Sequence, residues 1–461
     1  MTKKRNSIAK LILCAVLAAT MMFSIALPVL AEREPISTGT DAENPATAAF
    51  TKIFKMPINT TTPAAEFTFE IIPVSINDDK ALVGKMPLLG NDGSAKVSFT
   101  AGDPATFIGD DGGTKYLVAQ TPDILANLAK DGTPWTAGGA GIYKYHVKET
   151  QSGITLNTDP TYTGKEFEVY SEAEYDIEIW VVEDKNGILF PMYIVGYFIE
   201  GKPDEYYTTD EIDNGEKLDP TPGEEITVPG NPDEIGPLYS QIIFTNKYWK
   251  TDGTGIDPED PKNPDPDPDI NALEITKTVT GNTPSAFTKP YKFEVTVYTP
   301  ALIGTTGTYK AYIVDKDGKL SSPIPFTSKV SQSVSLKHGE RLVFFDLEVG
   351  AKVEVFETIE TADTSVKYSH TFGPNATMAF TRPLGTPGTW GFPRDPEDKG
   401  PHFTIQGAGT NVVKFVNNVT GTPPTGITID NLPYVMLLGI VLAGLVGFVV
   451  IKVRKNAKHD A

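Results

Sequence analysis

Two lysines in this chain are predicted to point into hydrophobic cores. Side chains alternate between the two faces of a β-strand, so Lys277 shares a face with three apolar residues, Leu273, Ile275 and Val279. By the same rule, Lys52 lies on the face of Phe50 and Phe54. Burying an isolated ammonium costs several kcal/mol, so a lysine in such a place loses its proton, pairs with an acid or reacts. Both lysines therefore need partners of a particular chemistry.

A glutamate and an asparagine follow each lysine in the same chain order. The two ordered triplets are Lys52, Glu149 and Asn246, then Lys277, Glu357 and Asn417. The acids and amides share strand faces with Tyr143, Tyr145 and Val147, with Ile242 and Phe244, with Val353 and Val355, and with Val413 and Phe415. Each residue alone is compatible with a polar strand end at an edge or turn. The repetition of the triplet favours a shared role instead.

These three residue types are sufficient for one reaction, the formation of an isopeptide bond. A neutral lysine amine attacks the asparagine carboxamide, while a protonated glutamic acid polarises the carbonyl and transfers protons. Apolar surroundings lower the pKa of an amine, raise the pKa of a carboxyl and exclude competing water. Ammonia leaves, so the reaction occurs once per site, and we expect no turnover enzyme.

The elements that would position these residues are predicted to be strands. Short alternating runs bounded by Gly, Pro, Asn and Asp occur at residues 66–72, 175–181, 291–298 and 342–347, at the spacing typical of sandwiches. The sequence therefore predicts an all-β protein. One helix is expected over Thr121–Gly132, which has a capping threonine, a proline at the first helical position and a closing glycine.

A run rich in proline and aspartate at residues 257–269 predicts an extended spacer between two domains. An acidic stretch at residues 203–237 predicts a surface insertion in the first domain. The expected organisation is a signal peptide at 1–31, a first domain at 32–250, a linker at 251–270, a second domain at 271–421 and a C-terminal signal at 422–461.

The N-terminal segment is typical of export. Basic residues precede an apolar run that ends in Val29-Leu30-Ala31, which predicts a secretory signal peptide cleaved after Ala31. An uncleaved N-terminal membrane anchor is the alternative. The single cysteine, Cys14, lies inside this segment, so disulfides cannot stabilise the exported chain.

The C-terminal segment combines three signals. An apolar run at residues 434–451 is long enough to span a bilayer and is followed by basic residues. Just upstream stands the pentapeptide Thr422, Pro423, Pro424, Thr425 and Gly426. This order resembles the cell-wall sorting signal of Gram-positive surface proteins, which sortase cuts between Thr and Gly. The usual first residue is leucine, not threonine, and a plain membrane anchor is the alternative.

Charge and composition exclude several classes of function. The chain has 59 acidic and 40 basic residues, a net charge of −19, which argues against a nucleic-acid partner. The histidines are scattered without metal-ligand spacing, at His146, His338, His370, His402 and His459. No phosphate loop or nucleophile elbow is present. We therefore expect no metal, no cofactor and no catalytic turnover.

The chain resembles the T-antigen-type backbone pilins of Gram-positive, sortase-assembled pili. The matching stretches are 50–52, 145–149, 193–197 and 244–246 in the first domain, and 275–277, 355–357 and 415–417 in the second. The resemblance implies two immunoglobulin-like sandwiches with Lys52–Asn246 and Lys277–Asn417 bonds, assisted by Glu149 and Glu357. Lys55 competes with Lys52, but it falls on the opposite face from Phe50 and Phe54.

The resemblance also implies a lysine near the last strand of the first domain that accepts the next subunit. Tyr239 occupies that position here, so Lys202 or Lys217 takes this role or the role is absent. The expected protein is an exported pilus subunit on the cell wall, whose partners are sortase and identical subunits or peptidoglycan, with the membrane only a precursor stage. The alternative is a monomeric wall-anchored adhesin that binds a host or environmental ligand.

Overall fold

The computed structural model describes residues 36–109, 112–150, 153–156, 164–200, 214–223, 239–253, 267–304, 306–360, 364–374, 376–382, 388–392, 404–420 and 432–456. Within these ranges β-strands dominate, which confirms the predicted all-β class. The predicted signal peptide, most of the spacer at 257–269, Lys202 and the pentapeptide at 422–426 lie outside the described residues.

The first half of the chain forms two sheets. Their strands are β1 Ser37–Thr38, β2 Thr51–Pro57, β3 Ala65–Ile76, β4 Ser94–Phe99, β5 Phe107–Ile108, β6 Thr114–Gln120, β7 Gly141–Glu149, β8 Glu166–Val169, β9 Glu174–Glu183, β10 Leu189–Glu200, β11 Lys217–Leu218 and β12 Ile243–Asp252. One sheet has the order β1-β10-β9-β7-β3-β4, with β11 paired to β10. The other contains β12-β2-β6-β5, with β8 paired to β12.

The second half also forms two sheets. Their strands are β13 Leu273–Gly281, β14 Tyr291–Tyr298, β15 Thr308–Val314, β16 Ile324–Thr327, β17 Gln332–Leu336, β18 Arg341–Phe344, β20 Lys352–Ile359, β21 Thr364–Phe372, β22 Met378–Arg382, β23 Gly388–Phe392 and β24 Asn411–Val419. The larger sheet has the order β16-β15-β18-β13-β24-β21-β22, and the smaller one β17-β14-β20-β23. The short β19 (Leu347–Glu348) joins β12 of the first half.

In each half, an early strand lies beside the last strand in parallel. β2 pairs with β12, and Lys52 is opposite Phe244. β13 pairs with β24, and Lys277 is opposite Phe415. Parallel neighbours require a long connection, which here is almost the whole of the domain. The first and last segments of each domain therefore meet along one pair of strands.

Hydrophobic clusters fill the space between the sheets of each half. Alternating side chains of β7 and β14 contribute to these clusters, as the period-two pattern predicts. β2 is buried along its whole length. Its other face is covered by a separate cluster that includes Ile53, Tyr116 and Tyr239. A lysine on either face of β2 is therefore removed from water.

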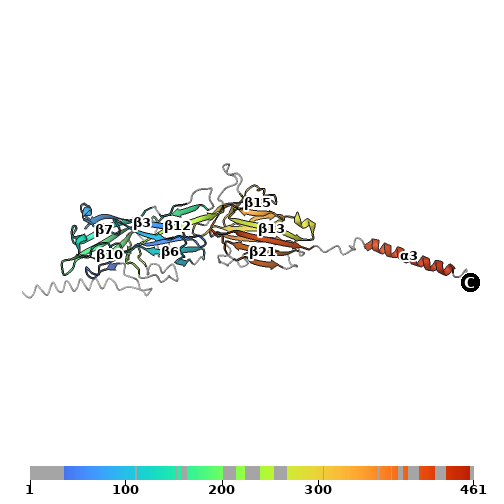
Figure 1. Ribbon diagram of the computed structural model, residues 1–461, viewed down its shortest axis with the longest axis horizontal. Coiled ribbons are helices and arrows are strands. Elements are labelled where there is room, and N and C mark those ends of the chain that lie inside the picture. Colours follow the sequence, from blue (N-terminus) through green and yellow to red (C-terminus); the bar gives the residue numbers. More distant parts are fainter. Residues whose placement is uncertain are drawn as a thin grey trace, which may run out of the picture.

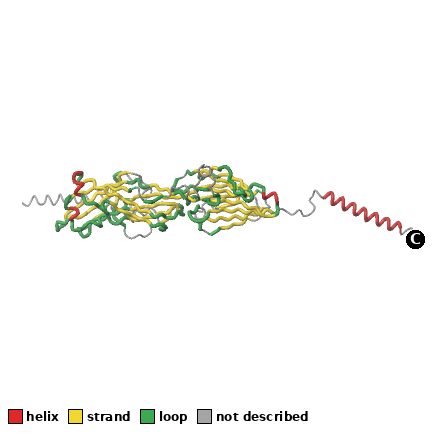
Figure 2. Tube along the Cα trace, turned by 45° about the horizontal axis from the view of Figure 1, so that its top comes forward, coloured by secondary structure: helices red, strands yellow, loops and turns green. Residues whose placement is uncertain are grey.

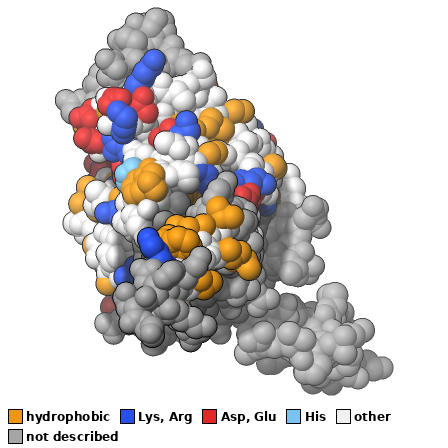
Figure 3. Space-filling view, turned by 90° about the vertical axis from the view of Figure 1, so that its right-hand side faces the viewer, with side chains coloured by type: hydrophobic (Ala, Val, Ile, Leu, Met, Phe, Trp, Pro, Cys, Tyr) orange, Lys and Arg blue, Asp and Glu red, His pale blue; other side chains and the backbone are white. Residues whose placement is uncertain are grey.

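The two halves lie end to end, with their strands running along the long axis of the molecule (Figures 1 and 2). β12 continues past the first half and pairs with β19. Asn411 Nδ2 donates a hydrogen bond to Asp252 Oδ2 at 2.9 Å, and Asn59 Nδ2 donates to Thr404 Oγ1 at 2.5 Å. These contacts connect the two halves. The end view in Figure 3 shows acidic, basic and hydrophobic side chains close together on the described surface.

The helix predicted over Thr121–Gly132 is wrong. This segment forms turns, followed by a short 3-10 helix η2 at Thr133–Trp135. The backbone N–H of Ile124 donates to the carbonyl of Ala48, and Asp123 Oδ1 accepts from the N–H of Ala48. A short isolated helix is marginal in water, so these tertiary hydrogen bonds hold the backbone in another conformation.

A helix, α3 (Leu432–Asn456), covers the apolar run expected to span the membrane. Its described apolar side chains, such as Leu437 and Val446, are exposed. Within the described residues, however, no helix reaches the length and hydropathy of a membrane span. The membrane span stays a prediction.

Candidate cross-linking sites

The first site lies between the two sheets of the first half. Lys52 on β2 and Asn246 on β12 project from the same sheet, and Glu149 on β7 projects from the opposite one. Lys52 Nζ donates to Glu149 Oε2 at 2.5 Å and to Asn246 Oδ1 at 2.5 Å. The side chains of Lys52 and Glu149 are buried, and Asn246 is 0 % exposed. The amine thus lies within bonding reach of the carboxamide.

The Asn246 carboxamide is hydrogen-bonded on both of its ends. Nδ2 donates to Glu149 Oε1 at 2.8 Å and to Glu168 Oε1 at 2.9 Å. Oδ1 accepts from the Ser171 backbone N–H at 2.9 Å in addition to Lys52. These contacts fix the orientation of the amide, because they distinguish its nitrogen from its oxygen. The carbonyl carbon is presented to the amine with its oxygen already polarised.

The second site repeats this arrangement in the second half. Lys277 on β13 and Asn417 on β24 share one sheet, and Glu357 on β20 comes from the other. Lys277 Nζ donates to Glu357 Oε1 at 2.6 Å, and Asn417 Nδ2 donates to the same oxygen at 2.7 Å. All three residues are buried. A single carboxylate oxygen therefore links the amine to the amide.

Burial shifts the pKa values of Lys277 and Glu357 in the directions that favour the neutral amine and the neutral carboxylic acid. Burial lowers the pKa of Lys277 to about 8, against the opposing charge and hydrogen bond of Glu357. Burial also raises the pKa of Glu357, which the charge of Lys277 and the hydrogen bonds of Lys277 and Asn417 oppose. Both shifts favour moving the proton from the lysine to the acid. The neutral amine is the nucleophilic form.

The first site contains a second, half-buried acid, Glu168. Burial raises the pKa of its carboxyl, while the hydrogen bond from Asn246 and the charge of Lys52 oppose the rise. Glu168 lies on β8, opposite Tyr248 of β12. In the second site, the charge of Arg382 instead acts on Glu357. The two sites therefore differ in the charge of their fourth member.

An aromatic framework recurs around both lysines. Phe69 lies opposite Glu149 in its sheet, and its ring centroid is 4.7 Å from that of Phe244. The corresponding residues of the second site, Phe293 and Phe415, have centroids 5.1 Å apart. The lysine nitrogens lie 4.2 Å from the Phe67 centroid and 4.3 Å from the Tyr291 centroid. These rings exclude water from the reacting groups and contact the amines through their faces.

Other predicted residues occupy different places. Lys55 is buried, 3 % exposed, and its Nζ lies 5.5 Å from the Tyr116 ring centroid on the other face of β2. Tyr239 is also buried in the cluster covering that face. Lys217 is exposed on β11, whereas Lys202 and residues 422–426 lie outside the described residues. Lys217 is thus accessible to another molecule, and the Tyr239 side chain is not.

The sequence reasoning missed Glu168, Ser171 and the aromatic partners of the lysines. Glu166-Phe167-Glu168-Val169 does alternate, which was a usable signal for a strand. The alternation alone does not indicate which face is inward, because β8 is short and carries apolar residues exposed to solvent, Phe167 and Val169. Ser171 contributes its backbone N–H, which no side-chain pattern predicts.

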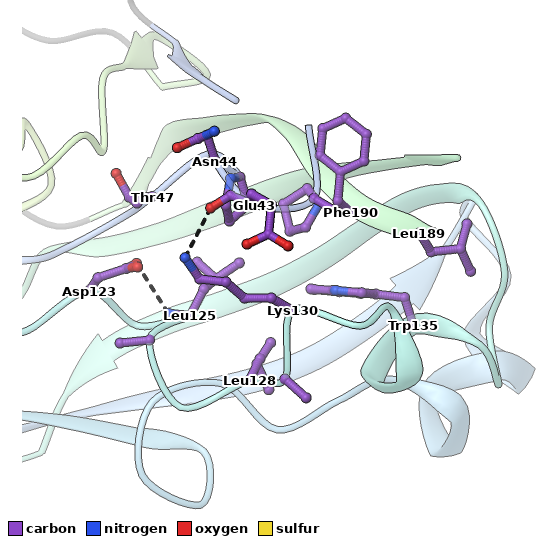
Figure 4. Close-up of a pocket in the computed structure, with 15 residues that line it drawn as sticks. Glu43, Asn44, Thr47, Asp123, Leu125, Leu128, Lys130, Trp135, Leu189 and Phe190 are labelled. Carbon is purple, nitrogen blue, oxygen red and sulfur yellow. Dashed lines mark hydrogen bonds between the residues drawn. The ribbon is translucent and has the colours of Figure 1, made fainter. Parts of the chain in front are cut away.

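A separate cavity of about 290 Å³ lies in the first half, and neither Lys52 nor Lys277 lines it. It is lined by Leu125, Leu128, Trp135 and Leu189 together with Glu43 and Lys130 (Figure 4). Lys130 Nζ donates to the backbone carbonyl of Glu43 at 3.0 Å. Asp123 Oδ1 accepts from the N–H of Leu125 at 3.1 Å. The cavity thus combines apolar walls with a charged rim.

No curated protein matches the chain. A family described as a domain of unknown function (DUF7601) matches residues 271–418. The chain is similar to streptococcal major pilins. A variant of the major pilin from Streptococcus pyogenes is 17% identical with a TM-score of 0.29, and the match covers 82% of this chain and 100% of that one.

Two further solved structures are similar to the chain. Another major pilin from Streptococcus pyogenes is 14% identical with a TM-score of 0.27, covering 84% of this chain and 100% of that one. An adhesin from Mobiluncus mulieris, described as containing intramolecular disulfide, isopeptide and ester bond cross-links, is 10% identical with a TM-score of 0.19, covering 82% and 100%. The motifs predicted a resemblance to streptococcal backbone pilins, and the solved structures to which the chain is similar include major pilins of Streptococcus pyogenes.

Proposed function

We propose that this protein is a structural subunit of a Gram-positive cell surface whose two immunoglobulin-like domains cross-link themselves through Lys52–Asn246 and Lys277–Asn417. One observation carries the proposal: a buried lysine, glutamate and asparagine meet in each half, in the same arrangement of strands. A buried ion pair beside a carboxamide is poor evidence for stability alone. Its repetition is explained by a shared reaction.

The reaction follows from the contacts at each lysine. The lysine passes its proton to the neighbouring glutamate, Glu149 or Glu357, and the free amine attacks the Cγ atom of the asparagine. The bond from Cγ to Nδ2 then breaks, Nδ2 leaves as ammonia, and the bond from Nζ to Cγ remains. The glutamate acts as the general acid and base. The water-excluded, aromatic surroundings protect the reaction from hydrolysis.

The bonds would connect the two strands that carry the ends of each domain. The first joins residues 194 positions apart, and the second joins residues 417 − 277 = 140 positions apart. Tension applied at the termini would then load a covalent bond and not a hydrogen-bonded ladder. By loop-closure entropy, each bond would also stabilise its domain by about 5 kcal/mol. Both effects suit a fibre or stalk that bears force.

Attachment to the surface is proposed from the C-terminal pentapeptide. Sortase would cut between Thr425 and Gly426 and join the new carboxyl to an amine of another subunit or of peptidoglycan. Lys217 is an exposed candidate for that amine, and Lys202 is a second one. In this scheme the membrane holds only the precursor, and the protein works on the cell wall or in a pilus without any cofactor.

Intact-mass measurement of the full chain, purified in detergent, tests the cross-links. We expect the mass to fall short of the calculated value by two ammonia molecules, and peptide mapping to recover branched Lys52–Asn246 and Lys277–Asn417 peptides. The variant carrying both Glu149→Ala and Glu357→Ala is the control and should keep both ammonia molecules. A wild-type chain with its full calculated mass would refute the proposal.

A monomeric, wall-anchored adhesin is the second candidate. The cavity beside Trp135 favours it, because its volume of about 290 Å³ is near the lower end of ligand pockets, roughly 300–1,000 Å³. Electrophoresis of cell-wall extracts separates the two candidates. A ladder of covalent high-mass species that disappears when sortase is deleted supports a polymer, whereas a single wall-linked species supports the adhesin.

A further inference from the structure

The first site holds a second carboxyl group, that of Glu168, which has no role in the reaction proposed above. Glu168 Oε1 accepts a hydrogen bond at 2.9 Å from Nδ2 of Asn246, the atom that must leave as ammonia. Glu149 Oε1 accepts the other hydrogen bond from the same nitrogen, at 2.8 Å. In the second site, the only acid in contact with the asparagine nitrogen among the described residues is Glu357.

We infer that Glu168 is a second catalytic acid of the first domain, which protonates the departing nitrogen of Asn246. This inference rests on the cross-linking reaction proposed above. In the second domain one glutamate must both accept the lysine proton and protonate the leaving nitrogen. In the first domain two glutamates share these tasks. Glu149, which contacts Lys52 Nζ, accepts the lysine proton, whereas Glu168, which contacts no amine in the described structure, supplies a proton to the leaving group.

The proton and bond changes balance without any outside reagent. Lys52 starts as an ammonium, Glu149 as a carboxylate and Glu168 as a carboxylic acid. Glu149 first takes one proton from Nζ, and the Nζ–Cγ bond then forms as negative charge develops on Oδ1. Glu168 gives its proton to Nδ2 and the Cγ–Nδ2 bond breaks. The second proton lost from Nζ reaches Glu168 by relay through Glu149 and the departing nitrogen, because Glu149 contacts both nitrogens and Glu168 contacts Nδ2. The products are the amide, ammonia and a protonated Glu149.

A backbone group completes the arrangement. The N–H of Ser171 donates to Asn246 Oδ1 at 2.9 Å, where the negative charge develops. Ser171 follows β8 by two residues, so the segment that carries Glu168 to the nitrogen also carries this donor to the oxygen. Fixed donors at a developing oxyanion are an effective form of catalysis. The segment 168–171 therefore contacts both ends of the reacting amide.

The surroundings of Glu168 favour its acid form. The titratable groups that interact with Glu168 are Lys52 from β2, Glu149 from β7, Tyr170 after β8 and Tyr248 from β12. Burial raises the pKa of Glu168 above the ordinary 4.5, and the charge of Glu149 adds to the rise, while the hydrogen bond from Asn246, the charge of Lys52 and the hydrogen bond of Tyr170 oppose it. A raised pKa makes the protonated, proton-donating form of this carboxyl more accessible than in an ordinary glutamate.

The test follows bond formation in chains that have never folded. Full-length chain recovered from inclusion bodies in denaturant is refolded by dilution, and both branched peptides are quantified over time by mass spectrometry. We expect Glu168→Gln to slow the Lys52–Asn246 bond by about 10²-fold or more and to leave the Lys277–Asn417 bond unchanged. The second bond thus reports, within the same molecule, that refolding conditions and recovery are normal.

The matched control is Glu166→Gln, on the same strand, where the carboxyl accepts from the Tyr248 hydroxyl at 2.7 Å and does not contact the amide. It should form the first bond at the wild-type rate. The pH profile provides a second readout. In the wild type the rate of the first bond falls as the pH rises through the pKa of Glu168, and this fall should vanish in Glu168→Gln but persist in Glu166→Gln.

The outcomes separate the two proposals. An unsubstituted chain that never forms the Lys52–Asn246 bond overturns the proposed function for this domain before any variant is made. A wild-type rate in Glu168→Gln overturns only the role of Glu168. If Glu168→Gln disturbs folding of the first domain, Glu168→Asp is used. It keeps an acid but shortens its reach, so it should slow the first bond while the rate still falls with pH. Equal slowing by Glu166→Gln would overturn the inference.

Discussion

The two domains place the same three groups in the same register but treat the asparagine differently. In both, the lysine is opposite a phenylalanine that precedes the asparagine by two residues, Phe244 in one and Phe415 in the other. Two acids and a backbone N–H hold the Asn246 carboxamide. The Asn417 side chain donates one hydrogen bond, to Glu357, and its Oδ1 accepts none from the described residues. The strands thus determine where the groups meet, and local loops determine how the amide is activated.

The fourth group differs in chemistry between the two sites. The first site has the acid Glu168, whereas the second has Arg382, which is 1 % exposed and lies 5.4 Å from the Trp390 ring centroid. Arg382 lies in one row with Val366 and Asn417 across three neighbouring strands. An additional acid can donate a proton, but a guanidinium can act only through its charge and hydrogen bonds. The comparison predicts shared requirements for the triplets and separate requirements for their fourth members.

The largest expected effect comes from removing either central acid. Glu149→Ala and Glu357→Ala should each abolish the bond of their own domain and leave the other intact, because each acid contacts the lysine and asparagine of its own domain. Intact mass would then show one ammonia lost instead of two. Glu354→Ala, on β20 beside Tyr298, is the control and should lose two. Failure of both bonds in one single variant would show that the domains react as a unit.

The second effect is on stability. Asn246→Ala and Asn417→Ala remove one cross-link each, and each should lower the free energy of unfolding of its domain by about 5 kcal/mol, since the unfolded chain regains the entropy of a long loop. Denaturant unfolding measures the change. Asn418→Ala, the exposed neighbour of Asn417, should change little. Equal stability of Asn417→Ala and Asn418→Ala would contradict a covalent link at this strand.

Alternation along strands was sufficient to predict the inward faces of the triplets. Lys277 and Glu357, for example, are buried on the faces that their apolar neighbours indicate. Contacts between sheets were not predictable, because alternation gives a face but no partner. The Phe67 and Tyr291 rings beside the lysines are examples. The helix at Thr121–Gly132 failed for a related reason: hydrogen bonds to Ala48, distant in sequence, outweigh local propensity.

The third effect is the pH dependence of stability in the second domain when its cross-link cannot form. Asn417→Ala leaves Lys277 and Glu357 buried without a bond. Between pH 8 and 10.5 the unfolded lysine binds a proton that the folded lysine, with its pKa lowered to about 8, does not. Stability should therefore rise with pH in this window, by at most about 3 kcal/mol. The raised pKa of Glu357 has the opposite sign, so stability should fall as the pH rises from 4.5 through that pKa.

Chemical unfolding across pH measures this curve, which should have a minimum between the two windows. Adding Lys277→Met to Asn417→Ala is the control, and it should remove the alkaline rise while leaving the acid limb. A stability of Asn417→Ala that only falls above pH 8 would mean that Lys277 keeps its proton in the folded state. The Lys277 amine would then lose its proton only during the bond-forming step.

The smallest effect tests the fourth member of the second site. The charge of Arg382 holds the pKa of Glu357 below the value that burial alone would give. Arg382→Met should raise that pKa. The rate of Lys277–Asn417 bond formation depends on the ionisation of Glu357, so its pH profile should move to higher pH. The bond itself should still form. Arg382→Lys keeps the charge and should leave the profile in place. Because Arg382 has no counterpart among the described residues of the first site, the Lys52–Asn246 bond provides the unchanged reference in every sample. A profile that moves equally in both domains would assign the shift to the solution and not to Arg382.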